Sequence, residues 1–253
     1  MMERIDRLLV EKGCAVSRTQ AQRLLSEGRV NVKVGGRWET PAKPSQKYPY
    51  TVDIETSRGE TDRYVSRGGL KLAGALETTG LCLDGMTVLD VGQSTGGFTD
   101  CALQAGAASV VGVEVGHDQL VMPLRQDSRV VCYEGMNARD LPHEQLLNHA
   151  NGPGFDLAVM DVSFISQTKI LPSLVPLIKS GGHLITLVKP QFEVGQAGLG
   201  KGGIVRDKRL YLKVKVSVID FCRSQGLLVS AWFDSPIQGG DGNKEFFIHA
   251  KKR

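Results

Sequence analysis

The stretch Val88-Leu89-Asp90-Val91-Gly92-Gln93-Ser94-Thr95-Gly96-Gly97-Phe98-Thr99-Asp100 decides how this chain folds. It reads as an apolar strand that ends in an acid, a glycine-rich turn and the start of a helix. In a parallel sheet, this order places a nucleotide-type pocket at the carboxyl end of the strand. The spacing is not the pyrophosphate pattern G-x-G-x-x-G. We therefore expect a ligand with an adenosine and no phosphates, for which S-adenosylmethionine (SAM) is the candidate. The alternative is a plain strand-to-helix turn.

Strand and helix patterns alternate around this stretch and predict the fold class. Apolar runs with strand character lie at 86–91, 109–115, 129–133, 155–160 and 183–189, with helices between them. A helix at about 66–79 comes first, and a helix at about 207–225 precedes two last strands at 227–233 and 245–250. Such alternation is typical of a parallel sheet covered on both faces, and the last two strands are expected to pair antiparallel. We predict an α/β fold for residues 64–253, with the Rossmann-like, seven-stranded sheet of class I methyltransferases.

The first 56 residues have a different pattern, and we interpret them as a separate small α+β domain. Two short amphipathic helices come first, and Ser17 is placed to cap the second. An alternating strand follows at 30–34. Residues 3–55 contain ten Lys and Arg against seven Asp and Glu, a balance that suits an RNA partner. The polar residues 57–63 read as a linker.

Composition excludes several classes of protein. The 253 residues carry a net charge of +4 and have an isoelectric point near 8.8. Five cysteines are scattered without a C-x-x-C pair, so neither a disulfide framework nor a zinc site is expected. The start Met-Met-Glu-Arg is too charged for a signal peptide, and no run of about 18 apolar residues is available to span a membrane. We expect a cytoplasmic protein with no metal and no membrane partner.

Polar residues after the second and third strands extend the predicted cofactor pocket. Glu114 ends the second strand, and a carboxylate there commonly accepts the ribose hydroxyls of an adenosine; the alternative is an exposed strand-end acid. The adenine would lie near Asn137, and Phe98 is either a pocket wall or a core side chain. The residues expected to bind the cofactor are Asp90, Gly92, Ser94, Thr95, Gly96, Gly97, Phe98, Thr99, Glu114, Asn137, Ala138 and Arg139.

Charged residues converge on the same edge of the predicted sheet. Asp161 follows the strand at 155–160, and Lys189 closes the next strand. A lysine that closes a buried strand is costly unless it is paired, and Asp161 can supply the pair. Glu245 begins the reversed final strand, which brings it to the same edge. Lys71, on the helix before the first strand, can be the fourth charge.

Long motifs run the length of the chain: Tyr64-Val-Ser-Arg-Gly-Gly-Leu-Lys71, the stretch 88–100, Asp161-Val-Ser-Phe-Ile-Ser166, Val188-Lys-Pro-Gln-Phe-Glu-Val-Gly195 and Gly242-Asn-Lys-Glu-Phe246. Together they resemble the TlyA family, whose members join an S-four RNA-binding module to an FtsJ-like ribose methyltransferase domain. Arg4-Ile-Asp-Arg-Leu-Leu and the pattern from Ser17 to Val32 resemble the S-four module itself. One departure is Gln93, where relatives usually carry a small residue; we expect it to be tolerated at the edge of the loop.

The resemblance implies SAM-dependent 2′-O-methylation of ribose, pointing to cytidine, in ribosomal RNA. The family's Lys-Asp-Lys-Glu tetrad falls on Lys71, Asp161, Lys189 and Glu245. A 2′-hydroxyl is a poor nucleophile, so the enzyme must align it with the activated methyl group and take its proton. We assign Lys189 as the base and the other three as positioning residues. A second ammonium from Lys71 favours a neutral Lys189 and the two carboxylates oppose it; the sequence leaves open which effect wins.

RNA contacts are expected from both parts of the chain. Arginines of the S-four module would grip phosphates, although each can instead belong to a solvated helix face. The segment 191–206 contains five glycines and reads as a mobile lid over the RNA or as a surface loop. The residues expected to bind RNA are Arg4, Arg18, Arg23, Arg29, Arg67, Lys201 and Arg206.

Three other functions stay open from the sequence. The intact tetrad argues against a non-catalytic RNA-binding or ribosome assembly factor. Many members carry the name haemolysin, but the lack of a signal or membrane segment argues against a dedicated membrane-lytic protein. A small-molecule methyltransferase would leave the N-terminal module unexplained. The expected partner is ribosomal RNA or a ribosomal subunit, and no obligate protein partner is inferred.

Overall fold

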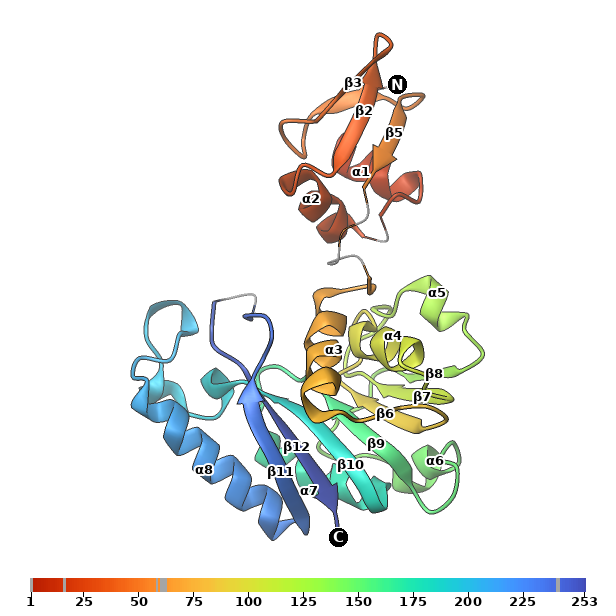
Figure 1. The fold of residues 1–253 in the computed structure, drawn as a ribbon. Helices are drawn as coiled ribbons and strands as arrows, with labels where there is room; N and C mark the ends of the chain where they lie inside the picture. Colours follow the sequence, from red (N-terminus) through yellow and green to blue (C-terminus); the bar gives the residue numbers. More distant parts are fainter. Residues whose placement is uncertain (1, 16, 58, 60–62, 240–241) are drawn as a thin grey trace. The chain divides into compact units, whose positions relative to one another are not determined.

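The computed structural model describes residues 2–15, 17–57, 59, 63–239 and 242–253 (Figure 1). The chain divides into two compact units, residues 1–66 and 67–253, and each is described by itself. Residues 58 and 60–62 of the predicted linker lie outside the described part. Among the helices within these ranges, none combines the length and the apolar character needed to cross a bilayer.

The N-terminal unit is a small α+β fold, as predicted. Its middle strand β2 pairs antiparallel with β3 and β5, and β1 pairs with β4. The predicted helix cap is confirmed, because the Ser17 side chain accepts a hydrogen bond from the Gln20 N–H at 3.2 Å. Leu8, Leu24 and Val30 belong to one buried core. The elements are β1 (Met2–Arg4), α1 (Ile5–Glu11), α2 (Arg18–Ser26), β2 (Val30–Val34), β3 (Arg37–Glu39), β4 (Lys47–Pro49) and β5 (Asp53–Thr56).

The second unit is built on a seven-stranded sheet with the order β11-β12-β10-β9-β6-β7-β8. Its strands are β6 (Thr87–Val91), β7 (Ser109–Val113), β8 (Val130–Tyr133), β9 (Phe155–Met160), β10 (Ile178–Val188), β11 (Leu227–Asp234) and β12 (Phe246–Lys252). Its helices are α3 (Arg67–Thr79), α4 (Gly97–Gln104), α5 (Met122–Arg125), α6 (His143–Leu147), α7 (Leu171–Leu174) and α8 (Arg209–Ser224). β12 pairs antiparallel with both of its neighbours, whereas the pairs from β10 through β8 are parallel. The predicted fold class is confirmed.

The strand β10 is longer than its sequence pattern suggests. It begins at Ile178, whereas the apolar run predicts a start at 183. The intervening Gly-Gly pair resembles a turn, but the backbone continues through an irregularity in the pairing with β9. At Gly182 a Cβ atom would lie only 3.0 Å from the Phe155 carbonyl oxygen, so glycine lets the two strands approach.

Helices cover both faces of the sheet (Figure 1). α3 and α4 pack against each other on one face. Leu146 of α6, Leu171 of α7 and Val214 of α8 share one buried cluster with Leu89 and Val91 of β6. All five residues of β6 are buried, as expected for a central strand between two helical layers. This packing fixes the carboxyl end of β6, from which the glycine-rich turn leaves.

Candidate functional site

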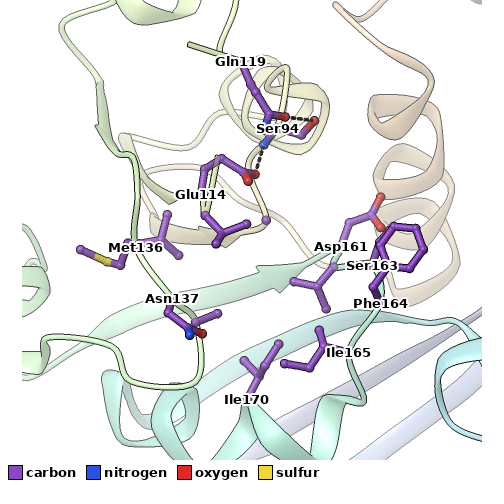
Figure 2. Close-up of a pocket in the computed structure, with 15 residues that line it drawn as sticks. Ser94, Glu114, Gln119, Met136, Asn137, Asp161, Ser163, Phe164, Ile165 and Ile170 are labelled. Carbon is purple, nitrogen blue, oxygen red and sulfur yellow. Dashed lines mark hydrogen bonds between the residues drawn. The ribbon is translucent and has the colours of Figure 1, made fainter. Parts of the chain in front are cut away.

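A cavity of about 490 Å³ opens at the carboxyl edge of the sheet, beside β6, β7 and β9 (Figure 2). Its volume suits a small-molecule ligand. Six residues singled out from the sequence line it: Gly92, Ser94, Glu114, Asn137, Ala138 and Asp161. The sequence patterns did not assign the rest of the wall, which consists of Val113, Val115, Gln119, Met136, Val162, Ser163, Phe164, Ile165 and Ile170.

The Glu114 carboxylate is fixed in the cavity wall by backbone N–H groups. Its Oε2 accepts a hydrogen bond from the Ser94 N–H at 2.9 Å, and its Oε1 accepts one from the Gly116 N–H at 2.9 Å. Ser94 has a φ of 49°, and its hydroxyl donates to Gln119 Oε1 at 3.2 Å (Figure 2). Each carboxylate oxygen has two lone pairs, so Glu114 can also accept hydroxyls of a bound ribose.

Two glycines in the turn let other parts of the chain pack closely against it. Gly92 has a φ of 84°, and a Cβ there would lie 2.6 Å from the Asp161 carbonyl oxygen. At Gly96 a Cβ would meet the Leu124 side chain at 2.4 Å and that of Leu120 at 2.7 Å. Gly96 is expected from the sequence to bind the cofactor, whereas in the structure two leucine side chains fill the space that a side chain at this position would need. The glycine fits the turn against α5, and the ligand wall begins at Gly92 and Ser94.

A buried polar chain supports the turn from inside. Thr99 donates to Asp90 Oδ2 at 2.6 Å, and the Gln93 amide donates to the Thr99 hydroxyl at 2.9 Å. Burial raises the pKa of Asp90 to about 7, and the hydrogen bond from Thr99 opposes the rise. Gln93 is 2% exposed, so the expectation that it lies at the edge of the loop is wrong. It fits because its side chain occupies the place where a Cβ on Gly112 would stand.

The remaining residues expected at the cofactor lie around the cavity rather than among its lining residues. Phe98 is buried and its ring stacks on Phe247 with centroids 6.4 Å apart, which favours its reading as a core side chain. The backbone N–H of Arg139 donates to Asn137 Oδ1 at 3.0 Å, and its side chain is exposed. Thr95 and Gly97 complete the turn into α4.

The four tetrad residues form two ion pairs. Lys71 Nζ lies 2.6 Å from Glu245 Oε2, and Lys189 Nζ lies 2.6 Å from Asp161 Oδ1. Val188 and Phe246 are the last opposed residues of the β10–β12 ladder. Lys189 and Glu245 directly adjoin that rung, which places the two ion pairs beside each other. Residues that are 174 positions apart in the chain thus share one site.

The loop after β9 adds residues that the tetrad motif does not name. Ser163 accepts a hydrogen bond from Lys189 Nζ at 2.9 Å. Phe164 is 90% exposed with a φ of 64°, and its ring lies 5.1 Å from that of Phe192. Glu193 accepts hydrogen bonds from the Ser166 hydroxyl and the Gln167 N–H, at 2.6 and 2.9 Å. The loops that carry Asp161 and Lys189 are therefore joined several times.

Arg23 and Arg29, both expected to bind RNA, engage the same exposed acid of their unit, Glu27. Arg29 pairs with Glu27 at 2.8 Å and also donates to the Ser57 carbonyl. Arg23 approaches the same carboxylate at 4.0 Å. Their side chains are only 13% and 20% exposed, so a structural role accounts for much of each. Arg4 and Arg18 differ, because both converge on one buried acid.

The glycine-rich segment in the second unit contains short 3-10 turns at Gln196–Gly198 and Lys201–Gly203, and Leu199 pairs with Val205 between and after them. Lys201 and Arg206 are exposed on it. The Gly200 N–H donates to the Ile204 carbonyl at 2.7 Å, and the buried Asn243 side chain accepts a hydrogen bond from Val205 N–H and donates to the Gly203 carbonyl. The segment is thus tied to the loop that carries Asn243 and Glu245 into β12. Arg67, at the start of α3, donates to the Gln238 carbonyl at 3.2 Å.

The sheet order, its one reversed strand and the cavity at the carboxyl edge define a class I methyltransferase. A model of the FtsJ-like methyltransferases matches residues 64–252, and a model of the S4 domain matches residues 3–37. The chain belongs to the FtsJ-like methyltransferase family. This family indicates SAM as the cofactor. The cavity fits such a ligand: its described lining offers a carboxylate and apolar walls, and no Lys or Arg that would bind a phosphate.

Similar proteins place the chain within the TlyA group of this family. It is 39% identical to a 16S/23S rRNA (cytidine-2′-O)-methyltransferase TlyA of Mycobacterium tuberculosis, over 97% of this chain and 88% of that protein. It is 38% identical to Hemolysin A of Brachyspira hyodysenteriae, over 97% of this chain and 98% of that protein. A solved structure of a candidate hemolysin from Streptococcus thermophilus is 41% identical in sequence and has a TM-score of 0.75. The match covers 99% of this chain and 88% of that chain.

Proposed function

We propose that this protein transfers the SAM methyl group to a ribose 2′-hydroxyl, that of a cytidine, in cytoplasmic ribosomal RNA. The observation that carries the proposal is that Asp161 contacts both the cofactor cavity and the proposed base. It lines the cofactor cavity, and its carboxylate lies 2.6 Å from Lys189 Nζ. A basic nitrogen held at the rim of a methyl-donor pocket is what methylation of a hydroxyl requires. The name of the mycobacterial relative supports the choice of RNA and nucleoside.

Each tetrad residue has a distinct part in the proposed reaction. SAM supplies an activated methyl group, so the protein has to align the 2′-oxygen and remove its proton. Lys189 first has to lose its own extra proton; its amine Nζ then takes the 2′-hydroxyl proton as the oxygen–methyl bond forms and the methyl–sulfur bond breaks, which would leave S-adenosylhomocysteine as the second product. Asp161 and Ser163 hold Nζ at the rim of the cavity. The pair formed by Lys71 and Glu245 adjoins Lys189 at the end of the ladder and orients the ribose.

The N-terminal unit is proposed to hold the RNA while the second unit reacts. The match to the S4 domain model covers residues 3–37, and this region carries most of the basic residues of the unit. Phosphate contacts give affinity and position without reading sequence. Exposed Lys201 and Arg206 are proposed to contact the RNA on the second unit.

A labelling experiment tests the proposed function. The full-length protein is incubated with methyl-labelled SAM and ribosomal subunits from a strain that lacks the gene, and the nucleosides are then separated by mass. We expect label in 2′-O-methylcytidine, and about 10²-fold slower labelling with Lys189→Met. Label in a base, or in a different nucleoside, would correct the substrate. RNA binding without transfer by the folded wild type would favour an assembly factor, and leakage of liposomes would favour a lytic protein.

A further inference from the structure

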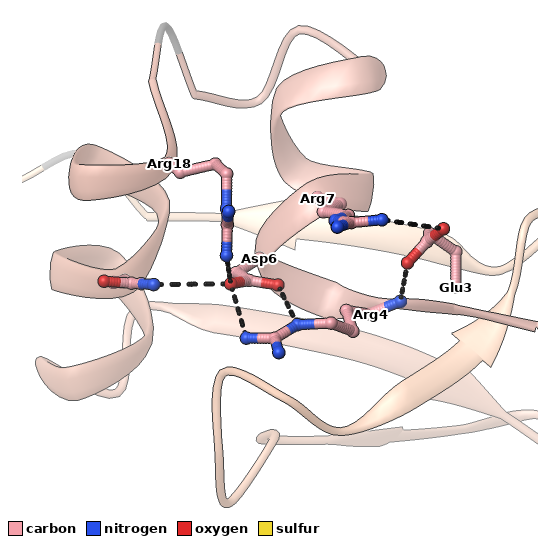
Figure 3. Close-up of polar contacts among 6 residues, drawn as sticks. Glu3, Arg4, Asp6, Arg7 and Arg18 are labelled. Atoms are coloured by element: carbon pink, nitrogen blue, oxygen red, sulfur yellow. Dashed lines mark hydrogen bonds and ion pairs between the residues drawn. The ribbon is translucent and has the colours of Figure 1, made fainter.

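A buried carboxylate holds two arginines of the N-terminal unit next to each other. Asp6, on α1, is fully buried. Its Oδ1 accepts from Arg4 Nε at 2.9 Å, and its Oδ2 accepts from Arg4 Nη2 at 2.9 Å and from Arg18 Nη2 at 3.1 Å. Gln22 of α2 donates to the same Oδ2 at 3.3 Å. Figure 3 shows the guanidinium groups of Arg4 and Arg18 reaching Asp6 from different sides.

The hydrogen bonds explain why a charge can be buried here. An isolated buried carboxylate would take up a proton, whereas charge-assisted hydrogen bonds favour the ionised form. The fork from Arg4, ahead of the bonds from Arg18 and Gln22, holds the pKa of Asp6 well below its usual range, against the opposing effect of burial. Asp6 is therefore a permanent negative charge in the interior of the unit.

The arginines that hold Asp6 are themselves at the surface. The side chain of Arg4 is 35% exposed and that of Arg18 is 53% exposed. A guanidinium has five N–H donors, and Asp6 takes two from Arg4 and one from Arg18. Because Nη2 of both residues bonds to the same oxygen, two like-charged groups are kept next to each other in fixed orientations.

We infer that Asp6 is a positioning residue that fixes Arg4 and Arg18 as a paired binding site for backbone phosphates of RNA. This inference rests on the proposed function. It adds that a carboxylate, Asp6, promotes phosphate binding by holding the arginines that contact the phosphate. Asp6 lowers the repulsion between the two guanidinium groups and orders them before RNA arrives. Their remaining N–H groups then meet phosphate oxygens in the planar geometry that arginine provides.

Whether Asp6→Asn weakens or strengthens RNA binding distinguishes a positioning role of Asp6 from a purely electrostatic effect of its charge. Asp6→Asn removes a negative charge from an RNA-binding unit, so Coulomb attraction alone would make RNA binding tighter. Positioning predicts that affinity falls instead, by about tenfold, because phosphate hydrogen bonds are lost. Glu11→Gln is the matched control: it removes the same charge from an exposed position on the same helix. We expect that variant to bind as tightly as wild type or slightly more tightly.

The measurements use the full chain with 23S and 16S rRNA, titrated at several salt concentrations. For Asp6→Asn we expect weaker binding, a salt slope reduced by about one, a raised KM for rRNA, an unchanged kcat at saturating RNA and unchanged SAM affinity. A purely structural role would lower folded protein and kcat together. Binding by folded Asp6→Asn that equals or exceeds that of Glu11→Gln would overturn the inference.

A second variant keeps the test valid if Asp6→Asn unfolds. Arg18→Lys preserves the net charge and leaves the Arg4 fork on Asp6 intact, but replaces a planar fork with a point charge. We expect about fivefold weaker RNA binding. Arg7→Lys is its control, because Arg7 has the same 53% exposure and pairs with Glu3 instead. Equal affinity in both lysine variants would reject the paired site. Failure of the wild type to bind or methylate rRNA would instead reject the proposed function.

Discussion

The carboxamide of Gln93 fills the place where a side chain at residue 112 would stand. A Cβ on Gly112, in β7, would lie 2.0 Å from the Gln93 side-chain carbon. Gln93 follows the carboxyl end of β6, and its side chain lies against β7 at Gly112 and donates to Thr99 of α4. The bulky Gln93 side chain therefore fits in the cofactor turn only because β7 has a glycine at residue 112, so the two positions depend on each other in packing.

This relationship makes a prediction about stability. Gly112→Ala should destabilise the protein by about 1–3 kcal/mol, because the added methyl group overpacks a buried site and displaces a hydrogen-bonded amide. Urea unfolding measures the change. In the Gly112→Ala/Gln93→Ala double variant the space is free again, so part of the loss should be recovered. If the double variant is as unstable as the sum of the two single variants, the positions are independent.

Asp90 makes stability depend on pH in a defined direction. Its pKa is raised by burial to about 7 in the folded protein, against about 4 in an unfolded chain. Between these values the folded state keeps a proton that the unfolded state has lost, so stability falls as pH rises from about 4 to about 7. Asp90→Asn should remove this component. Unfolding at pH 5 and pH 7.5 should show a smaller difference for the variant; an identical difference would mean that Asp90 does not titrate there.

Glu114 is the sharpest test of the cofactor cavity. Glu114→Gln keeps the shape of the side chain but replaces one acceptor oxygen by a donor, which the Ser94 or Gly116 N–H then opposes. We expect SAM affinity to fall by about tenfold or more, with RNA affinity unchanged, as measured by calorimetry and RNA titration. Glu144→Gln, at an exposed position on α6, should bind SAM normally. Normal binding by both variants would move the ribose away from Glu114.

Removal of the proposed base should affect the chemical step most. Lys189→Met retains most of the side-chain volume without the nitrogen, and single-turnover methylation should fall by about 10²-fold or more. Lys71→Met should also slow the step, and the double variant should be little worse than Lys189→Met, as expected of groups that act as one unit. Lys213→Met, exposed on α8, is the control. Near-normal transfer by folded Lys189→Met would leave the base to be found elsewhere.

We expect the second unit to bind SAM and the N-terminal unit to contribute RNA binding. A chain that starts near residue 58 should still bind SAM, because the cavity belongs to the second unit. It should methylate rRNA poorly, and its RNA affinity should depend less on salt because phosphate contacts are lost. Radiolabel transfer and filter binding measure the two effects. Equal activity of the short and full chains would remove the N-terminal unit from substrate recognition.

Local patterns in the sequence were enough to predict the sheet and the edge at which its charges meet. Strands such as β6 are buried on both faces, so they read as mostly apolar runs, and their carboxyl ends share an edge in any parallel sheet. The interior position of Gln93 was not predictable, because it depends on a glycine in another strand. The sequence pattern assigned no role to Phe164. Its left-handed backbone and its place beside the cavity arise from how two loops meet.

The position of β12 sets a condition on the synthesis of this protein. Residues 246–252 are made after every other strand, yet they lie inside the sheet, between β10 and β11. Until they leave the ribosome, β10 and β11 have open hydrogen-bonding edges, and Glu245 has no ladder to bring it to Lys71. A nascent chain can assemble the cofactor turn early but cannot complete the ion pairs of the tetrad. The tetrad therefore assembles only after residues 246–252 have left the ribosome and entered the sheet between β10 and β11.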